Sequence, residues 1–417
     1  MNYLRFLLSD PRLLSFGFTL NVFIALGQTF YISLFNADIR AELDLTNGEL
    51  AAVYGSATIV GSVILLVVGR LIDKVDLRAF AGATTVMVAF GCWFLANVTT
   101  PFMLFFAMLA VRFSAQSLWG VCAQVSMARY FDETRGKAAA VANTGYALGY
   151  AVFPLIGASL LAVFGWREAW TYTSLAVLIF ILPLIVLQLW GHGKRHAAYE
   201  ARLKQLAEAD GATAGLQWPL GKVLRDIRFW LIQPSMLAVP SVIFSIQFHQ
   251  VFLADAKGWS ITAFAGGYTV YSLVSLVAML VSGAMVDRVG SLRLVSISIW
   301  PLIPALLVLV FVDHPIGIVL LMMCTGMTFG VGLILFVTIW AEFYGTKHMG
   351  AIRSFNVFMN VSVASAVMVL TGWLIDRGTS VAQMAAGGIV VVLLSLLLLY
   401  FVRRPRGASA ATSVEAN

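Results

Sequence analysis

The sequence predicts an all-α membrane protein whose twelve transmembrane helices form two pseudo-symmetric six-helix bundles. Three observations support this fold class. Of the 417 residues, 60% are hydrophobic and only 11% are charged, which is more apolar surface than one soluble core can hide. Apolar windows of about 20 residues, the length that spans a bilayer, recur between short polar turns. The second half of the sequence also repeats features of the first.

The predicted helices follow one another closely along the chain. They are continuous apolar runs, unlike the ten-residue alternating strands of an outer-membrane barrel. They cover residues 14–36, 47–70, 79–97, 101–127, 137–164, 168–190, 229–254, 261–286, 294–312, 316–341, 350–375 and 381–402. We therefore expect an N-terminal six-helix bundle over residues 1–190, a cytoplasmic linker over 191–228, and a C-terminal six-helix bundle with a short cytoplasmic tail over 229–417.

Lys and Arg are distributed unevenly among the predicted loops. If the N-terminus lies inside, only Arg40, Arg167, Lys257 and Arg377 fall in outer loops and Arg112 falls within a helix, whereas the rest of the 27 cationic residues fall in cytoplasmic segments. Cationic loops stay in the cytoplasm. We therefore predict two cytoplasmic termini and an integral plasma-membrane location, which in bacteria is the inner membrane. The net charge of +7 then reflects topology and not nucleic-acid binding.

The cysteines carry no sign of a metal site or of a disulfide framework. All three lie within apolar runs and lack ligand spacing, so we expect no disulfide, no metal and no cofactor. A membrane enzyme or sensor would need clustered His, Asp or Glu at a membrane face, or an appended soluble domain. The sequence shows neither, so we expect no enzyme activity.

A short charged segment follows an apolar run in each half of the sequence. "GRLIDKVDLR" begins at Gly69 and "GAMVDRVGSLR" begins at Gly283, and a shift of 214 residues superimposes them without a gap. The same shift aligns Asp73 with Asp287, Pro101 with Pro315, Tyr130 with Tyr344, Gly136 with Gly350 and Tyr54 with Tyr268. The chain is therefore predicted to contain two copies of one six-helix design.

These two charged segments resemble the G-x-L-x-D-[RK]-x-G signature of the major facilitator superfamily. The arrangement of two six-helix halves, which is also that of the family, covers essentially the whole chain. Asp76 stands where that family usually has Gly, whereas the second copy keeps Gly290. The resemblance implies a secondary transporter that works by alternating access, in which this loop locks the cytoplasmic side of the outward-open state.

The resemblance places gating residues at the inner ends of the helices. An aspartate there can accept from a cation or from helix N-terminal amides. Arg129 is the expected partner of Asp73, and Glu342 could meet Arg288 or Arg293. The alternative is that these charges only mark the interface and orient the protein. The expected gating set is Gly69, Asp73, Lys74, Arg129, Gly283, Asp287, Arg288 and Glu342.

Arg112 is the ionisable residue that the sequence places near the middle of a span, where a charge is costly and usually faces a cavity. Its stretch "VRFSAQSLWG" resembles the R-x-x-x-G-x-G motif of proton-coupled members, with Gln116 and Trp119 on nearly the same helix face. A lone guanidinium, without a membrane-embedded carboxylate, favours an anionic substrate and best a carboxylate. The alternative is a structural arginine bonded to backbone or to neighbouring helices.

The stretch "YFDETRGKAAAVANTGYALGY" resembles the monocarboxylate and oxalate-formate transporter branch. That branch commonly carries a cation in the helix that corresponds to 261–286, and this helix has none, so substrate identity does not transfer. We expect proton-coupled uptake of a small, monocarboxylate-like organic anion, by a monomer in the lipid bilayer. The alternative is a proton-driven efflux antiporter for amphipathic compounds or metabolites. The matched positions are Tyr130, Phe131, Arg135, Ala138, Gly145 and Gly149.

Several other polar residues share helix faces in pairs and are expected to line the substrate site. Each pair could equally tie helices together through hydrogen bonds. His249 is a candidate for proton coupling together with Arg112, because its unperturbed pKa is near neutral; the alternative is a satisfied interfacial histidine. The expected substrate-binding set is Arg112, Gln116, Trp119, Gln28, Tyr31, Tyr54, Tyr268, Tyr271, Asn356 and Asn360, and the glycines at 145, 149, 157, 326, 330 and 332 are expected to serve packing.

Overall fold

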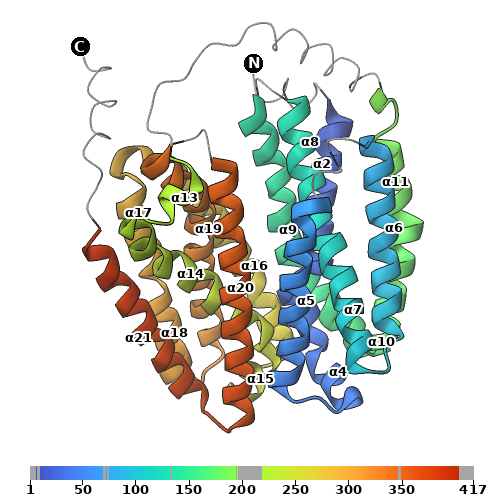
Figure 1. Cartoon of the computed structure of the whole chain (residues 1–417). Coiled ribbons are helices and arrows are strands. Elements are labelled where there is room, and N and C mark those ends of the chain that lie inside the picture. Colours follow the sequence, from blue (N-terminus) through green and yellow to red (C-terminus); the bar gives the residue numbers. More distant parts are fainter. Residues whose placement is uncertain are drawn as a thin grey trace, which may run out of the picture. The chain divides into compact units, whose positions relative to one another are not determined.

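The described part of the chain, in this computed structural model, is helical and contains no strand (Figure 1). The structure describes residues 6, 10–68, 72, 75–131, 134–193, 195, 218–345 and 349–402. Within them, 11 helices are long and apolar enough to cross a membrane, and the bent pair Pro11–Gly27 and Thr29–Leu43 makes a twelfth if it forms one span. The prediction of an all-α membrane protein is confirmed.

The chain divides into two compact units. The first unit comprises Met1–Ala212 together with Gln247–Val251, and the second unit comprises Thr213–Ile246 and Phe252–Asn417. A short segment from the second half of the sequence therefore packs with the first unit.

The first unit begins with a helix whose start is well specified. Pro11 occupies the first turn, where a proline ring is tolerated, and Asp10 caps the helix by accepting from the Leu13 N–H (3.2 Å). The elements of this unit are α2 (Pro11–Phe23), η1 (Ile24–Gly27), α3 (Thr29–Ile32), η2 (Ser33–Phe35), α4 (Asn36–Leu43), α5 (Asn47–Val68), α6 (Leu77–Ala96), α7 (Pro101–Val111), η4 (Arg112–Leu118), α8 (Trp119–Tyr130), α9 (Arg135–Phe164), α10 (Trp166–Ala176), η6 (Val177–Ile181) and α11 (Leu182–Gln188).

The second unit packs its helices around an apolar core that includes Phe229 and Trp340. Ser380 and Gln383 form a reciprocal capping box at the start of its last helix, which satisfies two exposed backbone donors. The elements of this unit are α13 (Leu220–Val223), α14 (Ile227–Phe248), α15 (Gln250–Lys257), α16 (Ile261–Val289), α17 (Ser291–Ile299), α18 (Leu302–Phe311), α19 (Ile316–Tyr344), α20 (Met349–Asp376) and α21 (Val381–Tyr400), with the last residues of α14 and the first of α15 belonging to the first unit.

Glycines allow the closest helix contacts in both units. A Cβ on Gly149 of α9 would lie 2.5 Å from the Val22 carbonyl oxygen of α2, and one on Gly326 of α19 would lie 2.6 Å from the Tyr271 carbonyl oxygen of α16. Small residues let membrane helices approach to backbone contact. The packing role expected for these two glycines is confirmed.

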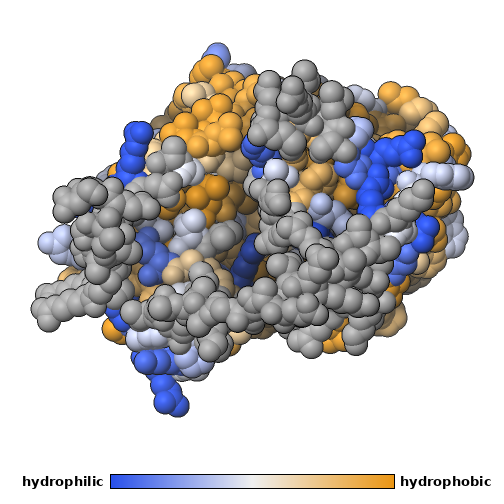
Figure 2. Space-filling view, turned by 90° about the horizontal axis from the view of Figure 1, so that it is seen from above, coloured by the Kyte–Doolittle hydropathy of each residue, from blue (hydrophilic) through white to orange (hydrophobic). Residues whose placement is uncertain are grey.

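Large apolar side chains cover the outer flanks of the helices, as expected where lipid is the solvent. On η6 and α11, for example, Phe180 is 70% exposed and Leu187 is 61% exposed. Figure 2, seen from above relative to Figure 1, shows hydrophobic residues over much of the described surface, with hydrophilic residues between them.

Besides the predicted span 168–190, which contains the π-helical segment η6, and the predicted span 294–312, which is interrupted between α17 and α18, three predicted spans depart from regular helix. The first is broken at Gln28, where the pair of helices bends by 46°, and it continues to Leu43 instead of ending at residue 36. The predicted 229–254 helix is interrupted at His249, between α14 and α15. The predicted 101–127 helix contains the π-helical segment η4, which begins at Arg112. The first and third irregularities meet at the site described below.

Candidate functional site

Arg112 lies buried within the first unit, with 5% of its surface exposed. Its Nη1 donates to the Gly27 carbonyl oxygen (3.1 Å) and contacts the Tyr54 hydroxyl, and its guanidinium carbon lies 4.2 Å from the centre of the Tyr54 ring. One edge of the guanidinium is therefore fixed by a backbone oxygen and an aromatic residue.

The break in the first span supplies the backbone oxygen. Gln28 adopts an extended conformation (φ −83°, ψ 151°), and the Tyr31 N–H, which would donate to Gly27 in a continuous helix, donates to the Gln28 carbonyl instead. Interrupted backbone at membrane depth is tolerated where protein groups satisfy it. Arg112 satisfies the Gly27 carbonyl here.

The π-helical segment η4 brings α8 and the first span into contact. The Trp119 N–H donates to the Ser114 carbonyl, five residues earlier, which marks the wider turn. A Cβ on Gly27 would lie 2.7 Å from the Gln116 backbone nitrogen. Glycine is therefore required at this crossing, and the crossing places the Gly27 carbonyl within reach of Arg112.

Aromatic and hydroxyl residues surround this arginine. The Tyr54 hydroxyl donates to Thr29 Oγ1 (2.8 Å), and the Tyr54 ring lies 4.7 Å from the ring of Phe248. Tyr150 interacts electrostatically with Arg112. The Tyr146 hydroxyl donates to the Tyr150 hydroxyl (3.4 Å).

Five of these neighbours, Gly27, Thr29, Tyr146, Tyr150 and Phe248, were not predicted from the sequence. The two tyrosines lie four apart in the stretch that resembles the monocarboxylate branch, and this spacing was the available signal. Nothing in the sequence indicates the roles of Gly27 and Thr29, because those roles depend on the break at Gln28.

The opposite edge of the guanidinium carries Nε. Arg112 Nε is buried and has no hydrogen-bond partner within the described residues. A buried donor that is left unpaired is costly. Nε and Nη2 form one edge of the guanidinium, which matches the two oxygens of a carboxylate. The arrangement is suited to bind an anion along that edge.

The other residues predicted for the first half lie in different surroundings. Trp119 is fully buried and donates its indole N–H to Thr85 Oγ1 of α6 (3.2 Å). Tyr31 packs against Trp170 of α10, with ring centres 5.5 Å apart. Gln28 is buried at the break itself, and Gln116 is half-buried in η4. The structure therefore brings Arg112 and Tyr54 into contact, and it directs Trp119 and Tyr31 toward α6 and α10.

A second polar cluster in the first unit involves the residues on both sides of His249. Ser33 Oγ donates to the Gln247 carbonyl (2.6 Å), and Asn36 Nδ2 donates to the Phe248 carbonyl (3.0 Å). Gln250 Nε2 donates to the Phe30 carbonyl (2.9 Å) and to Ser33 Oγ (2.9 Å). His249 is buried, with 5% of its surface exposed, at the interruption that these bonds hold in place.

In the second unit, the predicted polar residues lie within the helices and are buried. The rings of Tyr268 and Tyr271 are 6.1 Å apart, and Asn360 Nδ2 donates to Asn356 Oδ1 (2.7 Å). Asn356 Nδ2 and both amide atoms of Gln233 have no hydrogen-bond partner within the described residues. Gln233 was not predicted, although it is an amide in an apolar run.

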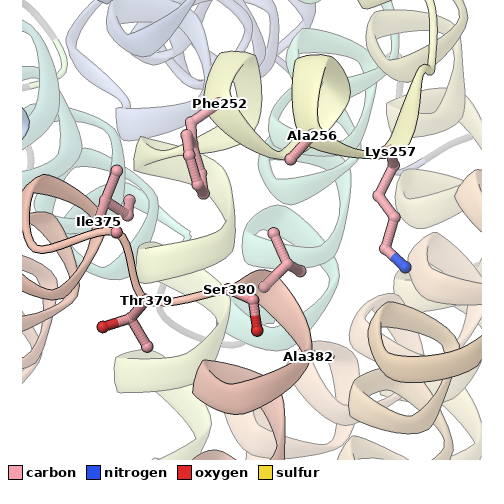
Figure 3. Close-up of a pocket in the computed structure, with 9 residues that line it drawn as sticks. Phe252, Ala256, Lys257, Ile375, Thr379, Ser380 and Ala382 are labelled. Atoms are coloured by element: carbon pink, nitrogen blue, oxygen red, sulfur yellow. The ribbon is translucent and has the colours of Figure 1, made fainter.

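A hollow of about 390 Å³ lies at the end of the second unit where α15 ends and α21 begins (Figure 3). Phe252, Ile375 and Thr379 contribute to its lining, and Lys257 also lines it. The Lys257 ammonium is bound to Asp313 (2.7 Å), and Figure 3 shows it directed away from the hydroxyl groups of Thr379 and Ser380. The described lining of this hollow therefore offers no available charge.

A model of the Major Facilitator Superfamily matches residues 17–367 of the chain, and a second match covers residues 243–416. The chain belongs to the major facilitator superfamily. It is therefore a membrane transporter and not an enzyme.

Individual relatives are distant. The uncharacterized MFS-type transporter YhjX of Escherichia coli (strain K12) is 20% identical over 330 residues, which cover 78% of this chain and 79% of that protein. The crystal structure of the nucleoside transporter NupG is similar in fold, with a TM-score of 0.64 and 16% identity over 96% of this chain and 100% of that one. A mutant of NupG gives the same TM-score at 15% identity, over 93% and 98% of the two chains. These likenesses show the fold alone.

The predicted gating residues of this superfamily member are described only in part. Gly69, Asp73 and Lys74 lie outside the described residues, as does the side chain of Asp287. Arg129 Nη1 donates to the Ile72 carbonyl (3.3 Å) in the loop that was expected to hold its partner.

The second copy of the loop differs from the expected ion pairing. The Glu342 carboxylate accepts from the Ser291 N–H (2.9 Å) at the start of α17, whereas the described residues show no ion pair between Glu342 and either Arg288 or Arg293. A helix N-terminus attracts a carboxylate through its unpaired N–H groups, which explains the difference. Arg288 is exposed, and no atom lies within 4 Å of the position a Cβ would take on Gly283.

Asp76, the departure from the family signature, has a structural role at the start of α6. It caps this helix by accepting from the Arg78 N–H (2.8 Å), and it also accepts from Arg78 Nε (3.0 Å) and Nη2 (2.8 Å). The Arg78 guanidinium thereby lowers the pKa of the Asp76 carboxyl to about 2.

Proposed function

We propose that the chain is a secondary active transporter that takes up a small organic anion together with protons, and that Arg112 binds the anion. The single observation that carries the proposal is the buried Nε of Arg112, which has no hydrogen-bond partner within the described residues. Gly27 and Tyr54 hold the guanidinium from one edge, so a planar anion can bind along the other.

The distribution of acidic residues supports an anion over a cation. Within the described spans, Glu49, Glu168 and Asp376 lie near helix ends, and Glu342 is bound to the start of α17. Asp38 and Glu42 lie in α4, at the end of the bent first span, where Glu42 is bound to Arg167. A cationic substrate would be repelled by Arg112 unless a carboxylate balanced its charge, and no carboxylate contacts Arg112 within the described residues. Monocarboxylates match the charge and the planarity of the guanidinium edge, which agrees with the resemblance of the Tyr130–Gly149 stretch.

His249 is proposed to carry the coupled proton. It is buried at the interruption between α14 and α15, and an imidazole titrates in the physiological range. His249→Gln is expected to abolish accumulation driven by a pH gradient while preserving exchange of labelled for unlabelled substrate. Accumulation at the parent rate in this variant would remove His249 from the coupling.

Gating by the charged loops is proposed on the same basis as in the superfamily. Asp73→Asn is expected to slow transport severalfold without reducing insertion into the membrane, because the sequence predicts that Asp73 follows the span 47–70 and does not belong to its apolar run. A transport rate equal to the parent's would leave these loops with a structural role only.

The test of the proposed function is uptake into proteoliposomes. Labelled lactate, oxalate, benzoate and uridine are each supplied with and without an inward pH gradient. We expect at least one carboxylate to accumulate and to do so faster with the gradient, and we expect Arg112→Gln but not the exposed-site variant Arg353→Gln to lose this uptake. Uptake of uridine alone would favour a nucleoside substrate, the class named for NupG. Acceleration of export by the gradient would favour the alternative of a proton-driven efflux antiporter.

A further inference from the structure

A hollow of about 450 Å³ lies in the first unit where α2 begins and α11 ends, and its lining includes Arg12, Leu187, Gln188 and Trp190. The two helices are tied together beside it, because Gln188 Nε2 donates to Thr19 Oγ1 (2.9 Å). We propose that this hollow binds an anionic phospholipid, with its phosphate at Arg12. The site is separate from the proposed Arg112 site and does not depend on it.

The lining residues lie at the depth of the lipid headgroups. Arg12 is the second residue of α2, at the start of the first span, and Trp190 lies two residues beyond the span Trp166–Gln188. Tryptophan and arginine at the ends of spans sit at the membrane–water interface. Trp190 is 68% exposed and Leu187 is 61% exposed. The hollow thus has a cation and an indole at headgroup level and an apolar wall along the acyl chains.

The local charge favours an anionic lipid over a zwitterionic one. Asp10, the neighbouring carboxylate, caps α2 and accepts from Arg195 Nη2 (2.7 Å), so its charge is already balanced. No acidic side chain lines the hollow within the described residues. Among the described residues, Arg12 therefore contributes a positive charge that no lining carboxylate balances. One cation near the membrane surface gives about a fivefold preference for an anionic lipid.

Gln188 indicates which headgroup fits. Its side chain is buried, with 7% of the residue exposed, and Nε2 is used by Thr19. Its Oε1 has no hydrogen-bond partner within the described residues. A phosphatidylglycerol headgroup carries hydroxyl groups that can donate to such an oxygen, and its phosphate carries the negative charge that Arg12 requires. Phosphatidylglycerol therefore meets both requirements of the lining.

The proposal can be tested by quenching of Trp190 in nanodiscs. The protein is placed in phosphatidylcholine discs that contain increasing fractions of brominated phosphatidylglycerol or brominated phosphatidylcholine. Because the chain has 11 tryptophans, the Trp190 signal is the difference between the parent and Trp190→Phe. We expect brominated phosphatidylglycerol to reach half-maximal quenching at about a fivefold lower fraction than brominated phosphatidylcholine. Arg12→Gln should remove this preference, whereas Arg12→Lys and the exposed control Arg353→Gln should keep it.

Three results would overturn the proposal. Equal quenching of the parent by both lipids would show that only bulk lipid surrounds Trp190, and this comparison needs no arginine variant. A preference that persists in Arg12→Gln would exclude Arg12 as the phosphate ligand. Loss of the preference when soluble glycerol phosphate is added at millimolar concentration would show a site for free anions instead of a lipid site.

Discussion

At the scale of single residues, Arg112 is held through Nη1, whereas its Nε has no hydrogen-bond partner within the described residues. Nη1 is used by the Gly27 carbonyl and the Tyr54 hydroxyl, and the Tyr54 ring covers the guanidinium. A purely structural arginine would use its remaining buried donor as well, since an unpaired buried donor costs about 1 to 3 kcal/mol. The unpaired Nε is therefore the observation that supports the proposed binding role of Arg112 over a purely structural one.

Asp76 gives a pH-dependent prediction at this scale. Its pKa is lowered to about 2 by the hydrogen bonds from Arg78, below the value of about 3.9 in an unfolded chain. The stabilisation is therefore fully present above about pH 4 and is lost as the pH falls through about 2. Both side chains are substantially exposed, at 54% for Arg78 and 37% for Asp76, so we expect less than about 1 kcal/mol.

Asp76→Asn keeps the helix cap, because Asn caps a helix as well as Asp does. The substitution removes the negative charge of the side chain. Thermal unfolding of the parent and of this variant should differ slightly at pH 6 and converge toward pH 2. A difference in stability that stays constant over this range would show that the ion pair does not act through the Asp76 charge.

At the scale of elements, two irregular segments create the site. The break at Gln28 redirects the Tyr31 N–H away from Gly27, and the π-helical segment η4 brings the Gln116 backbone against Gly27. Neither is encoded by proline, since the prolines of these spans are Pro11 and Pro101, in the first turns of their helices. Both irregularities lie where the two spans contact each other.

Gly27→Ala tests this crossing. A methyl group 2.7 Å from the Gln116 nitrogen and 3.0 Å from the Ala115 side chain must push the helices apart, which typically costs about 1 to 3 kcal/mol. We expect a lower unfolding temperature and weaker substrate binding, because the Gly27 carbonyl would shift away from Arg112.

Gly387→Ala is the matched control. No atom lies within 4 Å of its Cβ position, and it lies inside α21. Alanine is the better helix former by about 1 kcal/mol, so this variant should be as stable as the parent or slightly more stable. Equal stability of the Gly27 and Gly387 variants would mean that the crossing tolerates expansion.

The sequence indicates some of these features and not others. Arg112 can be identified because an ionisable residue stands out in an apolar run, and Gly149 because small residues mark close helix contacts. The direction of Trp119 cannot be predicted, because a regular period of 3.6 residues does not apply across η4. The roles of Gly27 and Thr29 also cannot be predicted from the sequence. The Gly27 carbonyl can accept from Arg112 only because the helix is broken at Gln28.

At the scale of the whole molecule, composition determines most of what can be predicted. Apolar runs of span length, separated by polar turns, specify the helices because lipid leaves backbone groups no other partners. The position of Lys and Arg predicts the orientation. The connection of Gln247–Val251 with the first unit could not be predicted, because it rests on side chains such as Ser33 and Asn36 that bond to specific backbone carbonyls.

Cysteine labelling tests the predicted orientation. In a variant without native cysteines, Glu208→Cys in the 191–228 linker should not react with a membrane-impermeant maleimide added to intact cells. Thr99→Cys, an exposed position between α6 and α7, should react. Labelling at position 208 and protection at position 99 would reverse the topology.

The central claim is that Arg112 binds a carboxylate directly. The most direct test is to measure, by calorimetry, the affinity of purified Arg112→Gln for the best carboxylate substrate. Thermal stability is measured on the same sample. A charge-assisted hydrogen bond contributes about 1.5 to 3 kcal/mol, so affinity should fall roughly 10- to 150-fold while the protein stays folded. Arg112→Lys should bind weakly as well, because it lacks the planar pair of donors. If folded Arg112→Gln binds the carboxylate as tightly as the parent, Arg112 is structural and the account of an anion transporter is wrong.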